Sequence, residues 1–131
     1  MTLIRNNNQL KQGIDFTGVQ NGNIHPTDID AVLEFDNEAL ILIEAKRENN
    51  EIPTGQRLVL ERICDSWHTE KSIALFVTHK TSDTEKLIDL HRCKVYKYYY
   101  NNKWHTNKGN TDFNNMLNKL GDYWGIKKLK I

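Results

Sequence analysis

Two short extended segments joined by a tight polar loop constrain the fold of this chain more than any other feature. Residues 28–35 alternate between polar and apolar side chains, and residues 39–46 form a nearly continuous apolar run. If residues 36–38 form a hairpin loop, Phe35 pairs with Ala39, and a five-residue loop gives the same pairing. The two segments are therefore predicted to form an antiparallel hairpin in this register.

The register decides which side chains share a face of the hairpin. Because side chains alternate along a strand and opposed residues share a face, Asp30 lies opposite Glu44 and Asp28 opposite Lys46. Opposed Cβ atoms lie about 5 Å apart, so the two carboxylates could share one cation. A two-residue loop would instead place Asp30 opposite Ile43, which would bury an acid among aliphatic side chains. The other face collects the apolar side chains Ile29, Ala31, Leu33 and Phe35.

The remaining pattern predicts one α/β domain over residues 1–131. A helix expected over residues 55–69 carries apolar side chains at helical spacing, namely Leu60, Ile63, Cys64 and Trp67. The strand expected next, over residues 72–78, should pair in parallel with residues 39–46, because a helix separates the two. Further expected elements are a strand or turn over 13–23, a short helix over 83–90, strands or a hairpin over 93–100 and 103–106, and a helix over 111–121.

Composition excludes several classes of protein. The longest apolar run is too short to span a bilayer, and the first residues lack the form of a signal peptide. Cys64 and Cys93 do not make a disulfide framework, so we expect a reducing cytoplasm and no membrane association. The five histidines show no zinc-like spacing among themselves or with the cysteines.

The net charge of +1 argues against a protein that coats DNA. The charged side chains are nevertheless divided unevenly along the chain. Residues 1–85 carry 8 basic and 14 acidic side chains, whereas residues 86–131 carry 10 basic and 3 acidic ones. The basic part also holds all five tyrosines and two of the three tryptophans, a composition suited to contacts with phosphates and bases. The alternative is an ordinary solvated surface. Candidate nucleic-acid contacts are Arg57, Lys94, Lys97 and Lys103.

These residues resemble the PD-(D/E)XK nuclease superfamily, and in particular its small phage and prophage nucleases, with more distant similarity to virus-type replication-repair nucleases and Holliday-junction resolvases. The matching residues are Asp30, the Glu-x-Lys signature Glu44-Ala45-Lys46, and Gln56 in the following helix. The resemblance covers about residues 24–78. The chain departs from the pattern at its Pro-Asp dipeptide, because Thr27 separates Pro26 from Asp28.

The resemblance implies a restriction-endonuclease-like core, which is a mixed central β-sheet flanked by helices. It also implies a nuclease that hydrolyses phosphodiester bonds in DNA with Mg²⁺ or Mn²⁺, and leaves 5′-phosphate and 3′-hydroxyl ends. The metal ligands would be Asp30, Glu44 and the backbone carbonyl of Ala45, with Asp28 as a further ligand. A β-bulge between the two aspartates would exchange their roles. A small core without a recognition domain favours structure-dependent or weakly specific cutting.

Two other side chains complete the expected site. Lys46 would orient or deprotonate the attacking water, or neutralise the transition state. Gln56 lies on the apolar stripe of its helix, where an amide is costly unless it has a partner, so we expect it to point at the bound water, Lys46 or a phosphate. Two copies of such a core can place two sites on opposite strands, which makes a homodimer an expected form.

Three other readings compete with a nuclease. The acids and Lys46 could form a surface salt bridge, although an exposed pair contributes only about 0–1 kcal/mol and would hardly dictate this strand pattern. The chain could be a non-catalytic nucleic-acid-binding module that kept the fold. It could also be a protein-interaction or inhibitor protein of a mobile element that binds through its aromatic C-terminal part.

Overall fold

The computed structural model describes residues 18, 27–81 and 87–131. The elements in chain order are β1 (Ala31–Phe35), β2 (Ala39–Arg47), α1 (Thr54–Ser66), β3 (Ser72–His79), β4 (Lys94–Tyr100), β5 (Lys103–Thr106) and α2 (Phe113–Trp124), with 3₁₀ turns at Leu90–Arg92 and Lys127–Leu129. Apart from Gly18, the strand or turn predicted over 13–23 lies outside the described residues, as does most of the helix predicted over 83–90. Residues 87–89 are not helical.

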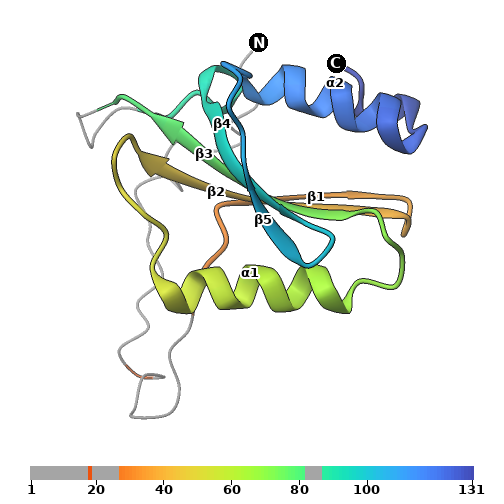
Figure 1. The fold of residues 1–131 in the computed structure, drawn as a ribbon, viewed down its shortest axis with the longest axis horizontal. Coiled ribbons are helices and arrows are strands. Elements are labelled where there is room, and N and C mark those ends of the chain that lie inside the picture. The colour runs from red at the N-terminus through yellow and green to blue at the C-terminus, as the bar shows by residue number, and fades with distance from the viewer. Residues whose placement is uncertain (1–17, 19–26, 82–86) are drawn as a thin grey trace.

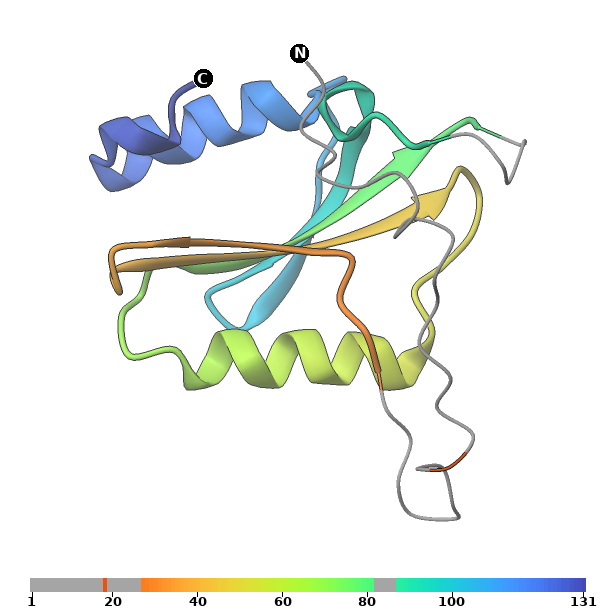
Figure 2. The ribbon, with the colours of Figure 1, turned by 180° about the vertical axis from the view of Figure 1, so that it is seen from behind.

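The described strands form one mixed sheet in the order β1-β2-β3-β4-β5. Strands β2 and β3 are parallel, and the other neighbouring pairs are antiparallel. Helix α1 covers one face of the sheet and α2 covers the other, as the two opposite views in Figures 1 and 2 show. The predicted α/β class and the parallel pairing across the first helix are therefore confirmed.

The predicted hairpin register is confirmed over the whole of β1, from Phe35 opposite Ala39 to Ala31 opposite Ile43. Its loop places Asp36 and Asn37 at φ angles of 52° and 60°. This left-handed region is tolerated best by Gly, Asn and Asp, so the loop residues suit the turn they make. The amide of Glu38 closes the loop by donating to the carbonyl of Phe35 at 2.8 Å.

The start of the first strand was predicted wrongly. The ladder begins at Ala31 rather than at residue 28, so neither Asp30 with Glu44 nor Asp28 with Lys46 forms a strand pair. Ile29 also departs from the predicted apolar face. It packs with the cluster under α1, whereas Ala31 and Leu33 pack with the cluster under α2. The chain therefore leaves the pleat just before the strand begins.

Each face of the sheet has its own apolar core. The α2 side buries the odd-numbered side chains from Ala39 to Ile43 in β2 and from Ile73 to Val77 in β3, together with apolar residues of α2 such as Leu117. The α1 side is smaller and holds Leu40, Leu42, Leu60, Cys64, Ala74 and Tyr99. Within the described ranges, no helix is long and apolar enough to cross a membrane.

Helix α2 carries signals at both ends that fix its length. The side chain of Asp112 caps the first turn by accepting from the amide of Asn115 at 2.8 Å. Gly125 ends the helix at φ 70°, a left-handed conformation that costs glycine little. The helix therefore runs past residue 121, the predicted end, because Gly121 is an interior helical position.

Candidate functional site

Glu44 is the buried acid of the sheet. It lies near the carboxyl end of β2, in register with Phe76 of β3, and is 2% exposed. Its even-numbered neighbours Leu40 and Leu42 face α1, so Glu44 and Lys46 continue that face toward the end of the strand. The predicted placement of a carboxylate and a lysine on one face is therefore observed.

The charges around Glu44 do not balance. Its carboxylate accepts a contact from Lys46, with Nζ 3.3 Å from Oε1. Burial nevertheless raises the pKa of Glu44 above its ordinary value, with the charge of Asp30 as the second cause. Lys46 lowers this pKa and Asp28 raises it least. One lysine and two further carboxylates thus act on Glu44, and Asp30 raises its pKa more than Asp28 does.

Asp30 is tied to the backbone of the Glu-x-Lys segment. Its Oδ2 accepts a hydrogen bond from the amide of Ala45 at 2.8 Å. This contact explains why β1 begins only at Ala31. The side chain of Asp30 binds the Ala45 amide, which would otherwise bind a backbone carbonyl of an earlier residue in β1. The N–H and C=O of one residue in an antiparallel ladder point to the same neighbour, so the carbonyl of Ala45 also faces the Asp30 segment.

Gln56 lies in the first turn of α1, at the level of Glu44. The hydroxyl of Ser72 donates to the carbonyl of Cys64 at 2.9 Å, and Ser72 is in register with Leu40. From Cys64 back to Gln56 the helix rises about 12 Å, and from Leu40 to Glu44 the strand advances about 13 Å. Figure 1 shows the start of α1 beneath the carboxyl end of β2. The Oε1 atom of Gln56 is buried and accepts no hydrogen bond from the described residues.

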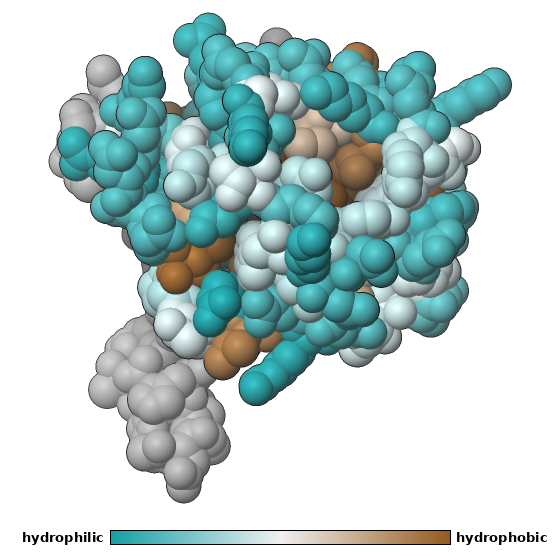
Figure 3. All heavy atoms as spheres, in the orientation of Figure 1, coloured by the Kyte–Doolittle hydropathy of each residue, from teal (hydrophilic) through white to brown (hydrophobic). Residues whose placement is uncertain are grey.

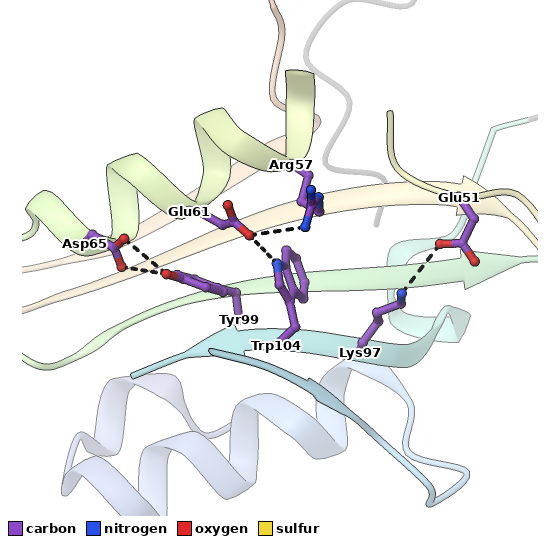
Figure 4. Close-up of polar contacts among 7 residues, drawn as sticks. All are labelled: Glu51, Arg57, Glu61, Asp65, Lys97, Tyr99 and Trp104. Atoms are coloured by element: carbon purple, nitrogen blue, oxygen red, sulfur yellow. Dashed lines mark hydrogen bonds and ion pairs between the residues drawn. The ribbon is translucent and has the colours of Figure 1, made fainter. Parts of the chain in front are cut away.

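Polar side chains of α1 contact aromatic residues of β4 and β5, as Figure 4 shows. The indole of Trp104 donates to Glu61 at 2.7 Å, and the hydroxyl of Tyr99 donates to Asp65 at 2.9 Å. Arg57 lies 3.6 Å from the same Glu61 oxygen that Trp104 binds. These contacts could not be predicted from the sequence, because nothing in an acidic helix stripe or in aromatic residues far along the chain indicates that they pair.

The structure separates the four predicted nucleic-acid contacts. Arg57 and Lys97 line one cavity. Phe76, on the strand β3 that lies between β2 and β4, forms part of its wall. Lys94 is exposed at the start of β4, in register with Thr78 near the end of β3. Lys103 follows the β4–β5 turn, next to Tyr100, at the opposite end of the sheet from Glu44. Only Arg57 and Lys97 therefore share a concave surface.

Most of the aromatic residues predicted as base contacts serve the fold instead. Tyr99 and Trp124 are buried, and Tyr98 stacks on His105 with ring centroids 5.0 Å apart. Tyr96 is the exception in β4, at 44% exposed. A register shift between Phe76 and Val77 brings the ring of Tyr96 against Phe76, 5.7 Å away. The aromatic residues of β4 therefore pack mainly into the two apolar cores of the sheet.

No group of three or more His, Cys, Asp or Glu side chains gathers into a metal site within residues 27–81 and 87–131. Asp28 therefore does not join Asp30 and Glu44 in such a group, whereas the set of Asp30, Glu44 and the Ala45 carbonyl contains only two carboxylates and falls outside this criterion. Comparisons with protein-family models, with curated proteins and with solved structures find no match for this chain. The geometry of the site is therefore the basis for assigning a function to this protein.

Proposed function

We propose that this protein is a Mg²⁺- or Mn²⁺-dependent nuclease that hydrolyses phosphodiester bonds in DNA, on a restriction-endonuclease-like core. One observation carries the proposal. A buried Glu44 pairs with Lys46, and the amide between them binds the carboxylate of Asp30. A structural salt bridge would not require the further acids Asp30 and Asp28, because they weaken the pairing of Glu44 with Lys46.

The residues present fit a divalent cation. Carboxylates and a backbone carbonyl are the oxygen ligands that Mg²⁺ accepts, and Asp30, Glu44 and Ala45 offer them from adjoining segments. Burial, and after it the charge of Asp30, raises the pKa of Glu44, and a bound cation would favour the charged carboxylate against both effects. A bound ion would supply Lewis-acid stabilisation of phosphate charge and a more acidic water.

The side chains around these ligands have separable roles. Lys46 holds its ammonium at the buried carboxylate with a quarter of its side chain exposed, so it can face both the acid and a substrate phosphate. It would orient the attacking water or neutralise charge in the transition state. The unpartnered oxygen of Gln56 is available to accept a hydrogen bond from a water molecule or from Lys46.

The test is cleavage of a DNA panel with Mn²⁺ present. The panel contains linear, nicked, supercoiled, single-stranded, flap and four-way-junction DNA. Wild type should cleave at least one member, and Lys46→Ala and Glu44→Gln should abolish cleavage while leaving DNA binding largely intact. The matched control is Lys71→Ala, because Lys71 also pairs with a glutamate, Glu38, and its side chain is 25% exposed like that of Lys46.

The control lies at the amino end of β3, away from the proposed site, and should keep full activity. A wild type that cleaves no member of the panel refutes the nuclease. So does a Lys46→Ala protein as active as wild type. A chain that binds DNA equally well before and after Glu44→Gln, and never cuts it, is a binding module.

A further inference from the structure

A small cavity opens between the start of α1 and strands β3 to β5. Its volume is about 180 Å³. Ile52, Phe76 and Trp104 form its apolar walls, and Glu51, Arg57 and Lys97 supply its polar groups. Figure 4 shows Arg57 of α1 above Trp104 and Lys97 of β4 beside it. Figure 3 shows apolar surface in hollows between hydrophilic side chains on the face of the molecule seen in Figure 1.

Strand register places this cavity next to the candidate metal ligands. Glu44 of β2 is in register with Phe76 of β3, which is in register with Lys97 of β4. Neighbouring strands lie about 4.8 Å apart, so the backbone of Lys97 lies about 10 Å from that of Glu44. Phe76 connects the two positions and also forms part of the cavity wall. A strand whose phosphate reached Glu44 would thus pass over the cavity.

The cations of the cavity are held by partners that a phosphate can replace. Lys97 lies 3.5 Å from Glu51, a side chain that is 70% exposed. Arg57 lies 3.6 Å from Glu61 and keeps 44% of its side chain exposed. Pairs in contact with solvent are weak and exchange readily. An anion that enters the cavity can therefore bind both cations, and only weak ion pairs are broken.

The aromatic wall is more firmly fixed than the cations. The indole nitrogen of Trp104 donates to Glu61 at 2.7 Å, and its ring packs against Tyr99 with centroids 5.4 Å apart. Fixed aromatic faces beside cations are the combination that proteins use for bases of unpaired strands. The apolar walls offer room for one ring system, and a base within a duplex cannot reach them.

We propose that this cavity binds one unpaired nucleobase of the DNA strand, next to the phosphate at Glu44, with a neighbouring phosphate on Lys97 and Arg57. The inference rests on the proposed nuclease function and deepens it, because it assigns the substrate class. The preferred substrate has a single-stranded or splayed nucleotide beside the cut, as in a free strand, a flap or a frayed end. Intact duplex is a poor substrate.

The test measures binding without cleavage, by fluorescence anisotropy of labelled oligonucleotides in EDTA. The probes are a ten-nucleotide oligothymidylate, its blunt duplex and an abasic strand of the same length. The oligothymidylate should bind about tenfold more tightly than either of the others, because only it can place a base in the cavity. Lys97→Gln should weaken this binding about fivefold, since it removes one phosphate contact.

Glu51→Gln should strengthen binding, because it frees Lys97 from its partner. Two exposed residues on the α2 side provide matched charge controls. Lys119→Gln removes a cation as Lys97→Gln does, and Asp122→Asn breaks the pair with Lys130 as Glu51→Gln breaks the pair with Lys97. Both controls should change the dissociation constant less than twofold if the effect is local to the cavity.

Equal binding of the abasic strand and the oligothymidylate overturns the base site. So does an equal loss of affinity in Lys97→Gln and Lys119→Gln, which would indicate general attraction to DNA. Failure of the two proposals can be told apart. A protein that shows this preference but cleaves no DNA with Mn²⁺ refutes the nuclease alone, whereas one that cuts duplex and shows no preference for unpaired strands refutes the cavity alone.

Discussion

Replacing Lys46 by methionine should make the stability of this protein strongly dependent on pH. Methionine keeps the length and packing of the side chain but removes the ammonium 3.3 Å from Glu44. At that distance, an effective dielectric constant of about 20 gives an attraction of about 5 kcal/mol. The full loss is not realised, because the buried Glu44 can take up a proton instead.

Protonation of Glu44 limits how much stability Lys46→Met can lose. The ordinary pKa of Glu44 is 4.5, and each pH unit above it costs about 1.4 kcal/mol to keep the carboxyl neutral. The charge contribution to the loss is therefore at most about 3.4 kcal/mol at pH 7 and about 0.7 kcal/mol at pH 5. The sign follows from linkage. A carboxyl whose pKa is raised in the folded state binds more protons there than in the unfolded state, so stability falls as pH rises from 4.5 toward the raised pKa.

The assay is urea unfolding of wild type and Lys46→Met in EDTA at several pH values between about 5 and 8. We expect a loss of about 2–3 kcal/mol at pH 7 that shrinks below about 1 kcal/mol at pH 5. Adding Glu44→Gln to Lys46→Met should restore most of the loss at pH 7. Lys71→Met is the control and should cost less than about 1 kcal/mol at either pH, because its partner Glu38 is 48% exposed. A loss that does not change with pH, or that the second substitution fails to relieve, would refute the reasoning.

Two further predictions concern other parts of the fold. Burial raises the pKa of Cys64 to about 12, and it also raises the pKa of Cys93. Neither thiol should therefore react with a disulfide reagent at mildly alkaline pH until urea unfolds the protein. Rapid labelling of Cys64 in the native state would contradict this. Gly125→Ala should destabilise the protein by about 1 kcal/mol, because alanine is strained at φ 70°. Gly55→Ala, a helical position with no atom within 4 Å of the added Cβ, should leave stability unchanged or raise it by a few tenths of a kcal/mol in thermal or urea unfolding.

The sequence predicted the hairpin register because two independent signals agree there. The alternation before residue 35 and the polar loop residues both require Phe35 to face Ala39. The face of Glu44 and Lys46 follows from that register alone. The strand start could not be predicted, because a side chain of Asp30 replaces a backbone partner, and strand patterns do not record such an exchange.

The contacts that build the cavity were also beyond local patterns. Trp104 and Glu61 are 43 residues apart, and nothing near either one specifies the other. The shift between Phe76 and Val77 changes the face that Tyr96 presents, and a count of alternating residues along β4 would miss it. Aromatic composition therefore predicted binding where the fold uses most of these rings for packing.

The hydrogen bond between Asp30 and the Ala45 amide turns one backbone proton into a reporter of the site. A carboxylate has two oxygens and can bind the amide with one while the other takes a different partner. Its plane is then set before any ligand arrives, which lowers the entropy lost on binding. The chemical shift and exchange rate of the Ala45 amide proton should follow the charge and occupancy of Asp30, and they can be read without a substrate or any turnover.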